Sequence, residues 1–215
     1  MFFGSTLSDD IDISVQIAKF NKKCNAILSD FKGINGLTRF RMLQTYCYSF
    51  YGCQLWHLDN HLVSVFETQW RKACRKALSV PLRTHNVILP VVCQTLPFYY
   101  ILVKRYVKFI ISNLHSDNKS LRFLMLNSLN VSRSTTCCNV KILQNEFNIS
   151  LYDLLHSSCS TVQNKVINNY NVSVSSLTKS KCDIIKECIE MRDGISVSPL
   201  NYPQCQAIID YVCTY

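Results

Sequence analysis

The chain has 215 residues, of which 48% are hydrophobic and 17% charged, and its formal net charge is +9. A disordered chain would be poorer in apolar residues and richer in charge, and only 5 glycines and 5 prolines exclude a collagen-like or low-complexity sequence. The length suits one domain, or one domain with a small appendage.

The first predicted helix begins close to the N-terminus. Apolar residues recur every three or four positions from Ile13 to Phe31, which is the spacing of one helix face. Ser8 is a suitable N-cap for this helix, and the acidic residues that follow it suit the positive end of a helix dipole. Residues 1–8 are expected to form at most a short arm of a β-hairpin.

Further helices are predicted in the first half of the chain. Helical spacing continues over residues 37–55 and over residues 62–77, where Asp59 or Asn60 is the expected N-cap. Another helix is expected to begin at Pro97, because proline suits the first turn of a helix. Residues 9–115 are therefore predicted to form a compact helical bundle, and the fold class is mainly α.

The second half of the chain has a looser pattern. Residues 116–172 are predicted to be a helical extension with helices over 121–129 and 140–156 and a polar loop between them. Residues 173–180 are rich in serine and are predicted to be a linker, and residues 181–215 are predicted to form C-terminal helices.

The excess of basic charge lies in the first part of the chain. Residues 1–122 hold 16 Lys and Arg against 7 Asp and Glu, and residues 71–108 hold eight basic residues and no carboxylate. Such clusters indicate a phosphate-rich partner, although a solvated surface is the alternative. The predicted phosphate-binding residues are Arg71, Lys72, Arg75, Lys76, Arg83, Lys104, Arg105, Lys108, Lys22 and Lys23. Within the helix over 62–77, Arg71 and Arg75 are four residues apart, and so are Lys72 and Lys76. The two residues of each pair therefore lie on the same face of the helix.

Motifs for catalysis are sparse. The one adjacent acidic pair, Asp9 and Asp10, lies where a first helical turn favours carboxylates, so a structural role is expected in place of metal binding. His57 and His61 are four residues apart, and a surface position is expected for both. The sequence has no glycine-rich phosphate loop and no nucleophile motif. No catalytic residue, metal or cofactor is predicted.

The twelve cysteines lack the spacing of a zinc site, because no Cys-x-x-Cys pair occurs. The first residues do not have the pattern of a secretory signal peptide. A disulfide framework is therefore not expected, and most cysteines are predicted to be reduced, buried residues of a nuclear or cytoplasmic protein that is not secreted.

Several short motifs between residues 46 and 90 occur in an informative order. Tyr46-Cys47 is followed by Tyr51-Gly52 and by Leu55-Trp56. Next come Trp70-Arg71-Lys72-Ala73, then Pro81-Leu82-Arg83-Thr84-His85, then Leu89-Pro90. This order resembles the region after the palm in reverse transcriptases of LINE-type (non-LTR) retrotransposons, in particular the Jockey-like and chicken-repeat-like branches.

The resemblance implies a fold and a role for most of the chain. Residues 1–8, with Phe3-Gly4, are similar to a primer-grip hairpin, and residues 9–115 are similar to the thumb. A thumb packs along the template–primer duplex, so the implied partners are the backbone of RNA, RNA–DNA or DNA duplexes and the palm and fingers of a parent polymerase. The family's catalytic Ala-Asp-Asp turn precedes the primer grip and does not occur in this sequence. We therefore expect no polymerase activity from this chain alone.

Two other function classes remain open. One is a stand-alone helical protein-interaction module whose basic surface has no nucleic-acid role. The other is a peripheral membrane protein that uses residues 87–108 as a basic, amphipathic anchor. Stable insertion into a membrane is not expected, because Pro90 and Pro97 interrupt this apolar stretch and basic residues follow it.

Overall fold

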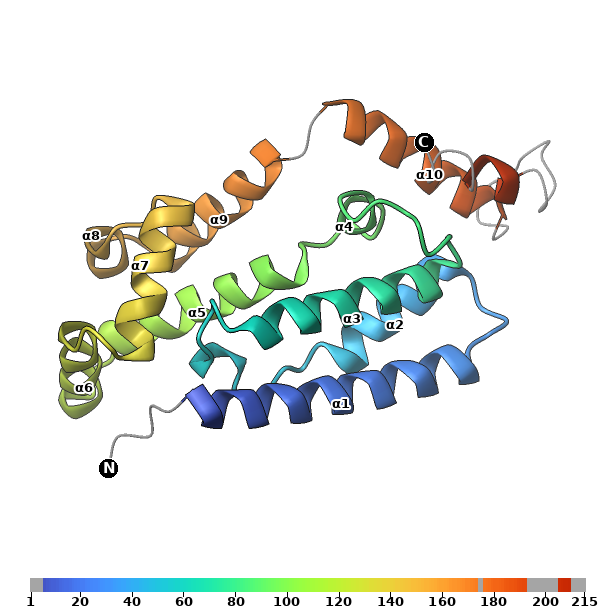
Figure 1. The fold of residues 1–215 in the computed structure, drawn as a ribbon. Coiled ribbons are helices and arrows are strands. Elements are labelled where there is room, and N and C mark those ends of the chain that lie inside the picture. The colour runs from blue at the N-terminus through green and yellow to red at the C-terminus, as the bar shows by residue number, and fades with distance from the viewer. Residues whose placement is uncertain (1–5, 174–175, 193–204, 210–215) are drawn as a thin grey trace. The chain divides into compact units, whose positions relative to one another are not determined.

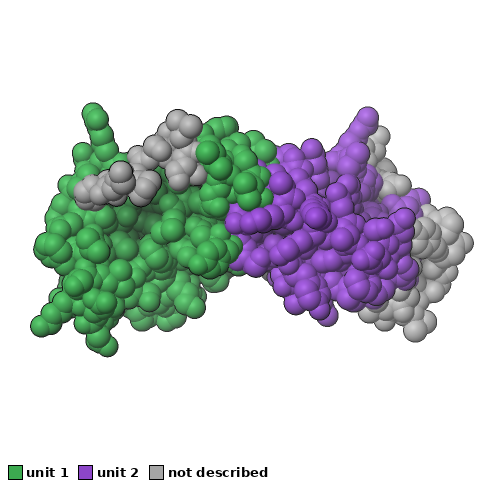
Figure 2. Space-filling model, turned by 90° about the horizontal axis from the view of Figure 1, so that it is seen from below, with its two compact units in different colours: residues 1–15, 51–66, 97–173 green, residues 16–50, 67–96, 174–215 purple. Residues whose placement is uncertain are grey.

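The computed structural model describes residues 6–173, 176–192 and 205–209, and Figure 1 shows its helices in chain order. These residues are mostly helical and include no β-strand, so the predicted mainly α class is confirmed. The chain divides into two compact units, coloured separately in Figure 2. Unit 1 comprises residues 1–15, 51–66 and 97–173, and unit 2 comprises residues 16–50, 67–96 and 174–215.

Helix α1 (Thr6–Asp30) matches the first predicted helix but begins earlier. Residues 6–8 were predicted as part of the hairpin arm and are helical, so Ser8 is not the N-cap. The remainder of that arm, residues 1–5, lies outside the described residues. Because α1 begins at Thr6, Asp9 lies in its first turn, where a carboxylate is favourable.

Helix α2 (Gly36–Cys47) is shorter than the predicted helix over residues 37–55. Asn35 caps its start by accepting a hydrogen bond from the Thr38 amide at 2.8 Å. Beyond its end, Phe50 and Gly52 have φ angles of 26° and 80°, which no continuous helix allows. A short 3₁₀ turn, η1 (Cys53–Leu55), follows.

The helices predicted over residues 62–77 and from Pro97 onward are both present. Helix α3 (His61–Leu78) is capped by Asn60, whose side chain accepts from the Leu62 amide at 2.9 Å. The apolar stretch that follows forms α4 (Ile88–Val92) and, directly after Pro97, α5 (Phe98–Leu114).

The second half of the chain is more helical than predicted. It forms α6 (Lys119–Asn130), α7 (Thr135–Phe147), α8 (Leu151–His156), α9 (Cys159–Ser173) and α10 (Ser176–Arg192).

Two predictions in this half were wrong. The predicted loop over 132–139 is helical from Thr135 onward, because the Ser134 side chain caps α7. The predicted helix over 140–156 is interrupted at Asn148, which is left-handed with a φ of 51°. In the predicted linker over 173–180, Ser173 is the last residue of α9, and residues 176–180 belong to α10. In the predicted C-terminal helices, residues 205–209 are also helical.

In unit 1, α5 packs against η1, α6, α8 and α9. One buried polar side chain, Asn139 of α7, links this core to the segment before α3. It accepts from the Leu58 amide and donates to the Trp56 carbonyl, both at 2.9 Å. Its amide therefore satisfies two backbone groups that would otherwise be buried without partners.

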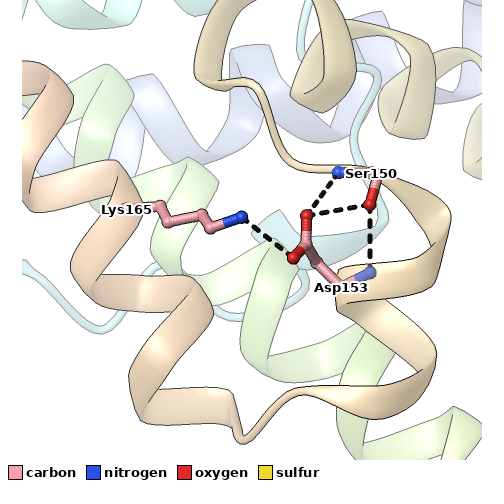
Figure 3. A network of polar contacts seen from close by, with 3 residues as sticks. All are labelled: Ser150, Asp153 and Lys165. Atoms are coloured by element: carbon pink, nitrogen blue, oxygen red, sulfur yellow. Dashed lines mark hydrogen bonds and ion pairs between the residues drawn. The ribbon is translucent and has the colours of Figure 1, made fainter.

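An ionic network in unit 1 joins α8 to α9 (Figure 3). Ser150 and Asp153 form a capping box at the start of α8, in which each side chain binds the other residue's backbone amide. Lys165 of α9 donates to the same carboxylate at 2.9 Å. This contact and the hydrogen bonds from Ser150 lower the pKa of Asp153.

In unit 2, aromatic side chains of separate segments form the core. Phe40 and Trp70 are almost completely buried, and the Trp70 indole donates to the Tyr48 hydroxyl. Phe20 of α1 lies 6.0 Å from Phe50 between ring centroids. Helix α10 packs against α2 and α4 within the same unit.

Candidate nucleic-acid interface

Helix α3 carries four of the predicted phosphate-binding residues, and its part from Glu67 onward belongs to unit 2. Its buried face includes Trp70, Cys74 and Ala77, which are each at most 1% exposed. Burial of this stripe turns the opposite side of the helix toward solvent. The helix carries two basic ridges, one formed by Arg71 and Arg75 and the other by Lys72 and Lys76, and their surroundings differ.

Arg71 is already paired within the protein. Its guanidinium donates to the Glu67 carboxylate at 2.7 Å, one helical turn earlier. Glu67 lies just before residue 71 and so outside the carboxylate-free segment 71–108. The i,i+4 spacing of Glu67 and Arg71 is the signal that could have found the pair.

Arg75 holds the turn that follows α3. Its guanidinium donates to the Thr84 carbonyl, at 2.8 Å from Nη2 and 3.3 Å from Nε, and to the Asn86 side chain at 2.6 Å. The pKa of Arg75 is lowered, first by burial and then by the nearby charge of Arg71. The donors of Arg75 thus hold the turn through backbone and side-chain acceptors of unit 2, and phosphate binding by Arg75 stays a prediction.

Lys72 and Lys76 form the ridge that stays in solvent. Both side chains are exposed, and their i,i+4 spacing places them on one face of α3. Ammonium groups in this position can bind neighbouring phosphates of a nucleic-acid backbone without contacting the bases.

Two further predicted lysines, on α1, belong to the same unit. Lys22 and Lys23 are exposed, and Lys23 lies close enough to Cys47 for its charge to favour the Cys47 thiolate. The hydrogen bond with Cys47 and burial raise the pKa of Cys24, and the charge of nearby Lys76 opposes this shift only in part. Lysines of α1 and α3 thus flank one pair of buried thiols. We call Lys22, Lys23, Lys72 and Lys76 the lysine face.

The remaining predicted residues are divided between the units. Arg83 is exposed in unit 2, whereas Lys104, Arg105 and Lys108 lie on α5 in unit 1. Lys108 is exposed, and Arg105 is partly buried and donates to the Cys53 sulfur at 3.7 Å. The segment 71–108, continuous in sequence, is therefore not a single basic element of the structure.

The aromatic residues near the basic segments divide into core and surface. Trp56 and Trp70 are each 1% exposed and lie in the core. Tyr46 and Tyr51, in contrast, are 62% and 86% exposed and lie at the surface. Exposed tyrosine rings can stack on unpaired bases, a contact that the sequence analysis did not assign to them.

The acidic residues at the start of α1 bind the segment before α3. Asp12 accepts from the Trp56 indole at 2.6 Å, and Asp10 accepts from the Asn60 side chain at 2.7 Å. Asp9 accepts from the His57 amide at 3.2 Å, and burial raises the pKa of its carboxyl. These contacts agree with the structural role predicted for Asp9 and Asp10.

Neither the cysteines nor the acidic residues gather into a metal site: within the described ranges, no three His, Cys, Asp or Glu side chains could hold an ion together. Ten cysteines in the described part of the chain are free thiols, and seven of these are buried, as predicted. Also within those ranges, no helix has the length and apolar character needed to cross a membrane. Most apolar side chains of the proposed membrane anchor, residues 87–108, are buried in the protein.

No protein-family model, curated protein or solved structure matches the chain.

Proposed function

We propose that the chain binds the sugar–phosphate backbone of nucleic acid through the lysine face of unit 2, without reading base sequence. The observation that carries this proposal is the contrast within α3. Arg71 and Arg75 bind protein groups, whereas Lys72 and Lys76 are exposed and lie in the same unit as Lys22 and Lys23. Lysine ammonium groups exposed in this way attract phosphate and release its counterions.

The sequence resemblance supplies the context for this activity. We propose that the chain corresponds to the thumb region of a LINE-type reverse transcriptase, where a duplex of template and primer is the natural ligand. The motifs from Tyr46 to Pro90 and the helical fold support this origin. Genomic sequence upstream of the reading frame tests it, because an in-frame Ala-Asp-Asp turn is expected there, and its absence from an intact locus would contradict the origin.

Fluorescence anisotropy with labelled 20-base-pair duplexes tests the binding. We expect RNA–DNA hybrids of unrelated sequence to bind with affinities within about threefold of one another, because phosphate contacts carry no sequence information. The double variant Lys72→Gln, Lys76→Gln should bind all of them more weakly. The matched control is Lys119→Gln, Lys141→Gln, which removes two exposed charges from unit 1.

The competing function classes predict different results. Strong binding to anionic vesicles without nucleic-acid binding would favour the membrane-surface protein. Equal binding by the parent and the Lys72/Lys76 variant would indicate that the lysine face is only a solvated surface. The protein-interaction module would then be the better explanation, since α6 exposes Phe123 and Leu124 by 63% and 62%.

A further inference from the structure

Helix α6, in unit 1, has more apolar side chains than the unit covers. Its sequence includes six large apolar residues, and only one of them, Met125, is buried. Phe123 and Leu124 are 63% and 62% exposed, and Leu121 and Leu126 are each 38% exposed. A helix that is apolar around most of its circumference is normally buried. The composition of α6 is therefore that of a helix with a further partner.

The exposed apolar side chains lie on both sides of the buried side of α6. The helix packs against α5 and α7, and Met125 marks the side that this packing buries (Figure 1). Leu121 and Leu124 are three residues apart on one side of Met125, and Phe123 and Leu126 are three residues apart on the other. Side chains at this spacing are neighbours on a helix surface and can pack between those of a second helix.

The Phe123–Leu126 side of α6 also carries positive charge. Lys119 and Arg122 precede Phe123 and Leu126 by four residues each, so a basic residue neighbours each of these apolar side chains. Both basic side chains are exposed. Residues 118–145 contain four basic residues and no carboxylate. A partner that covers this side therefore needs both apolar side chains and negative charge.

We propose that α6 docks an amphipathic helix of another protein, one that carries glutamate or aspartate beside its apolar stripe. Apolar side chains of the partner cover Phe123 and Leu126, and its carboxylates pair with Lys119 and Arg122. The site belongs to unit 1, so the proposal does not depend on nucleic-acid binding by the lysine face of unit 2.

Two other occupants fit α6 less well. A second copy packed α6 to α6 would bring the same basic residues together, and like charges across an interface weaken binding. An anionic membrane would attract these charges, but Asn127 and Asn130 lie four and seven residues after Phe123 on the same stripe. Acyl chains offer these amides no hydrogen bonds, whereas carboxylates of a protein partner can accept from them.

Fluorescence anisotropy with a labelled model peptide tests the site on the full chain. The probe has about three heptads, with leucine at the core positions and glutamate on both sides of the leucine stripe. Its matched control has lysine in place of every glutamate. We expect the glutamate peptide to bind about tenfold more tightly than the lysine peptide, or better.

Two exposed residues of α6 provide a matched pair of variants. Phe123→Ser should weaken binding of the glutamate peptide by about tenfold or more, because it removes a large side chain from the proposed contact. Leu124→Ser changes a side chain of similar exposure on the side without basic neighbours, and it should change binding by less than about threefold. Circular dichroism at 222 nm checks that each variant keeps its helices.

Reversal of charge separates docking from general attraction to a basic protein. The variant Lys119→Glu, Arg122→Glu should lose the glutamate peptide and gain the lysine peptide, a gain that an unfolded variant would not show. Lys72→Gln, Lys76→Gln should bind the glutamate peptide as the parent does.

Three results would overturn the proposal. The first is a parent that binds neither peptide, and the second is equal binding of the glutamate peptide by the parent and Phe123→Ser. The third is binding to anionic vesicles, or self-association of the chain, that Phe123→Ser abolishes while peptide binding is unaffected. Lipid or a second copy would then be the occupant of this side of α6.

Discussion

Replacement of Arg75 by glutamine should destabilise the protein, although the sequence alone makes Arg75 equivalent to its neighbour Lys76. The Arg75 guanidinium binds the Thr84 carbonyl and the Asn86 side chain, and Thr84 is only 2% exposed. A glutamine side chain is too short to reach these acceptors from the same position on α3. The turn after the helix would lose its anchor.

The size of the effect follows from these contacts. A hydrogen bond that involves a charged group contributes about 1.5–3 kcal/mol, and a buried carbonyl left without a donor costs about 1–3 kcal/mol. The two contributions together amount to about 2.5–6 kcal/mol. Because Arg75 is only partly buried, we expect a loss in the lower half of this sum, about 2.5–4 kcal/mol. In a chain of this length, such a loss lowers the unfolding temperature by about 5–16 °C.

Urea unfolding followed by circular dichroism at 222 nm measures the loss, with Lys76→Gln as the matched control. The control changes an exposed residue of the same helix and should stay within about 0.5 kcal/mol of the parent. If Arg75→Gln unfolds at the same urea concentration as Lys76→Gln, the contacts of Arg75 add nothing to stability. The distinction drawn between the two ridges of α3 would then be wrong.

Two further predictions concern unit 1. Asn139→Ala should cost about 2–5 kcal/mol, because it leaves the buried Leu58 amide and Trp56 carbonyl without partners; a loss below 1 kcal/mol in urea unfolding would contradict this. The Lys165 contact lowers the pKa of Asp153 below its ordinary 3.8, so its stabilising effect is present above that pH and disappears as the pH falls through the lowered value. Urea unfolding of parent and Asp153→Asn should therefore differ most near neutral pH and converge toward pH 2, and a constant difference would refute the assignment.

The buried face of α3 could be predicted from the sequence, whereas the state of its basic residues could not. Apolar spacing alone identifies Trp70 and Ala77 as core residues, because helical periodicity depends only on position along the chain. Arg75 is different, since its acceptors follow a turn whose path is set by tertiary packing. The pairing of Arg71 with Glu67 lies between these cases, because its i,i+4 spacing is visible in the sequence.

The breaks between helices were also hard to predict. Apolar spacing continues past Cys47 and past Phe147, but left-handed residues interrupt the helix soon after each position. Asn148 adopts this conformation without the signal that a glycine or proline would give. The exposure of Tyr51 has the same origin, because the residue lies in the irregular turn after α2 and not on a continued helix.

The most direct test of the lysine face is the salt dependence of binding to an RNA–DNA hybrid. Each lost phosphate contact lowers the slope of log Kobs against log [salt] by roughly 0.9. The variant with Lys22, Lys23, Lys72 and Lys76 changed to glutamine should therefore lose roughly 3–4 units of slope. The control removes an equal number of exposed charges from unit 1: Lys119, Arg122, Arg133 and Lys141.

We expect the slope of this control to stay within about one unit of the parent's. If the variant of the lysine face has the same slope as the control, these four lysines do not contact phosphate, and the proposed function is wrong.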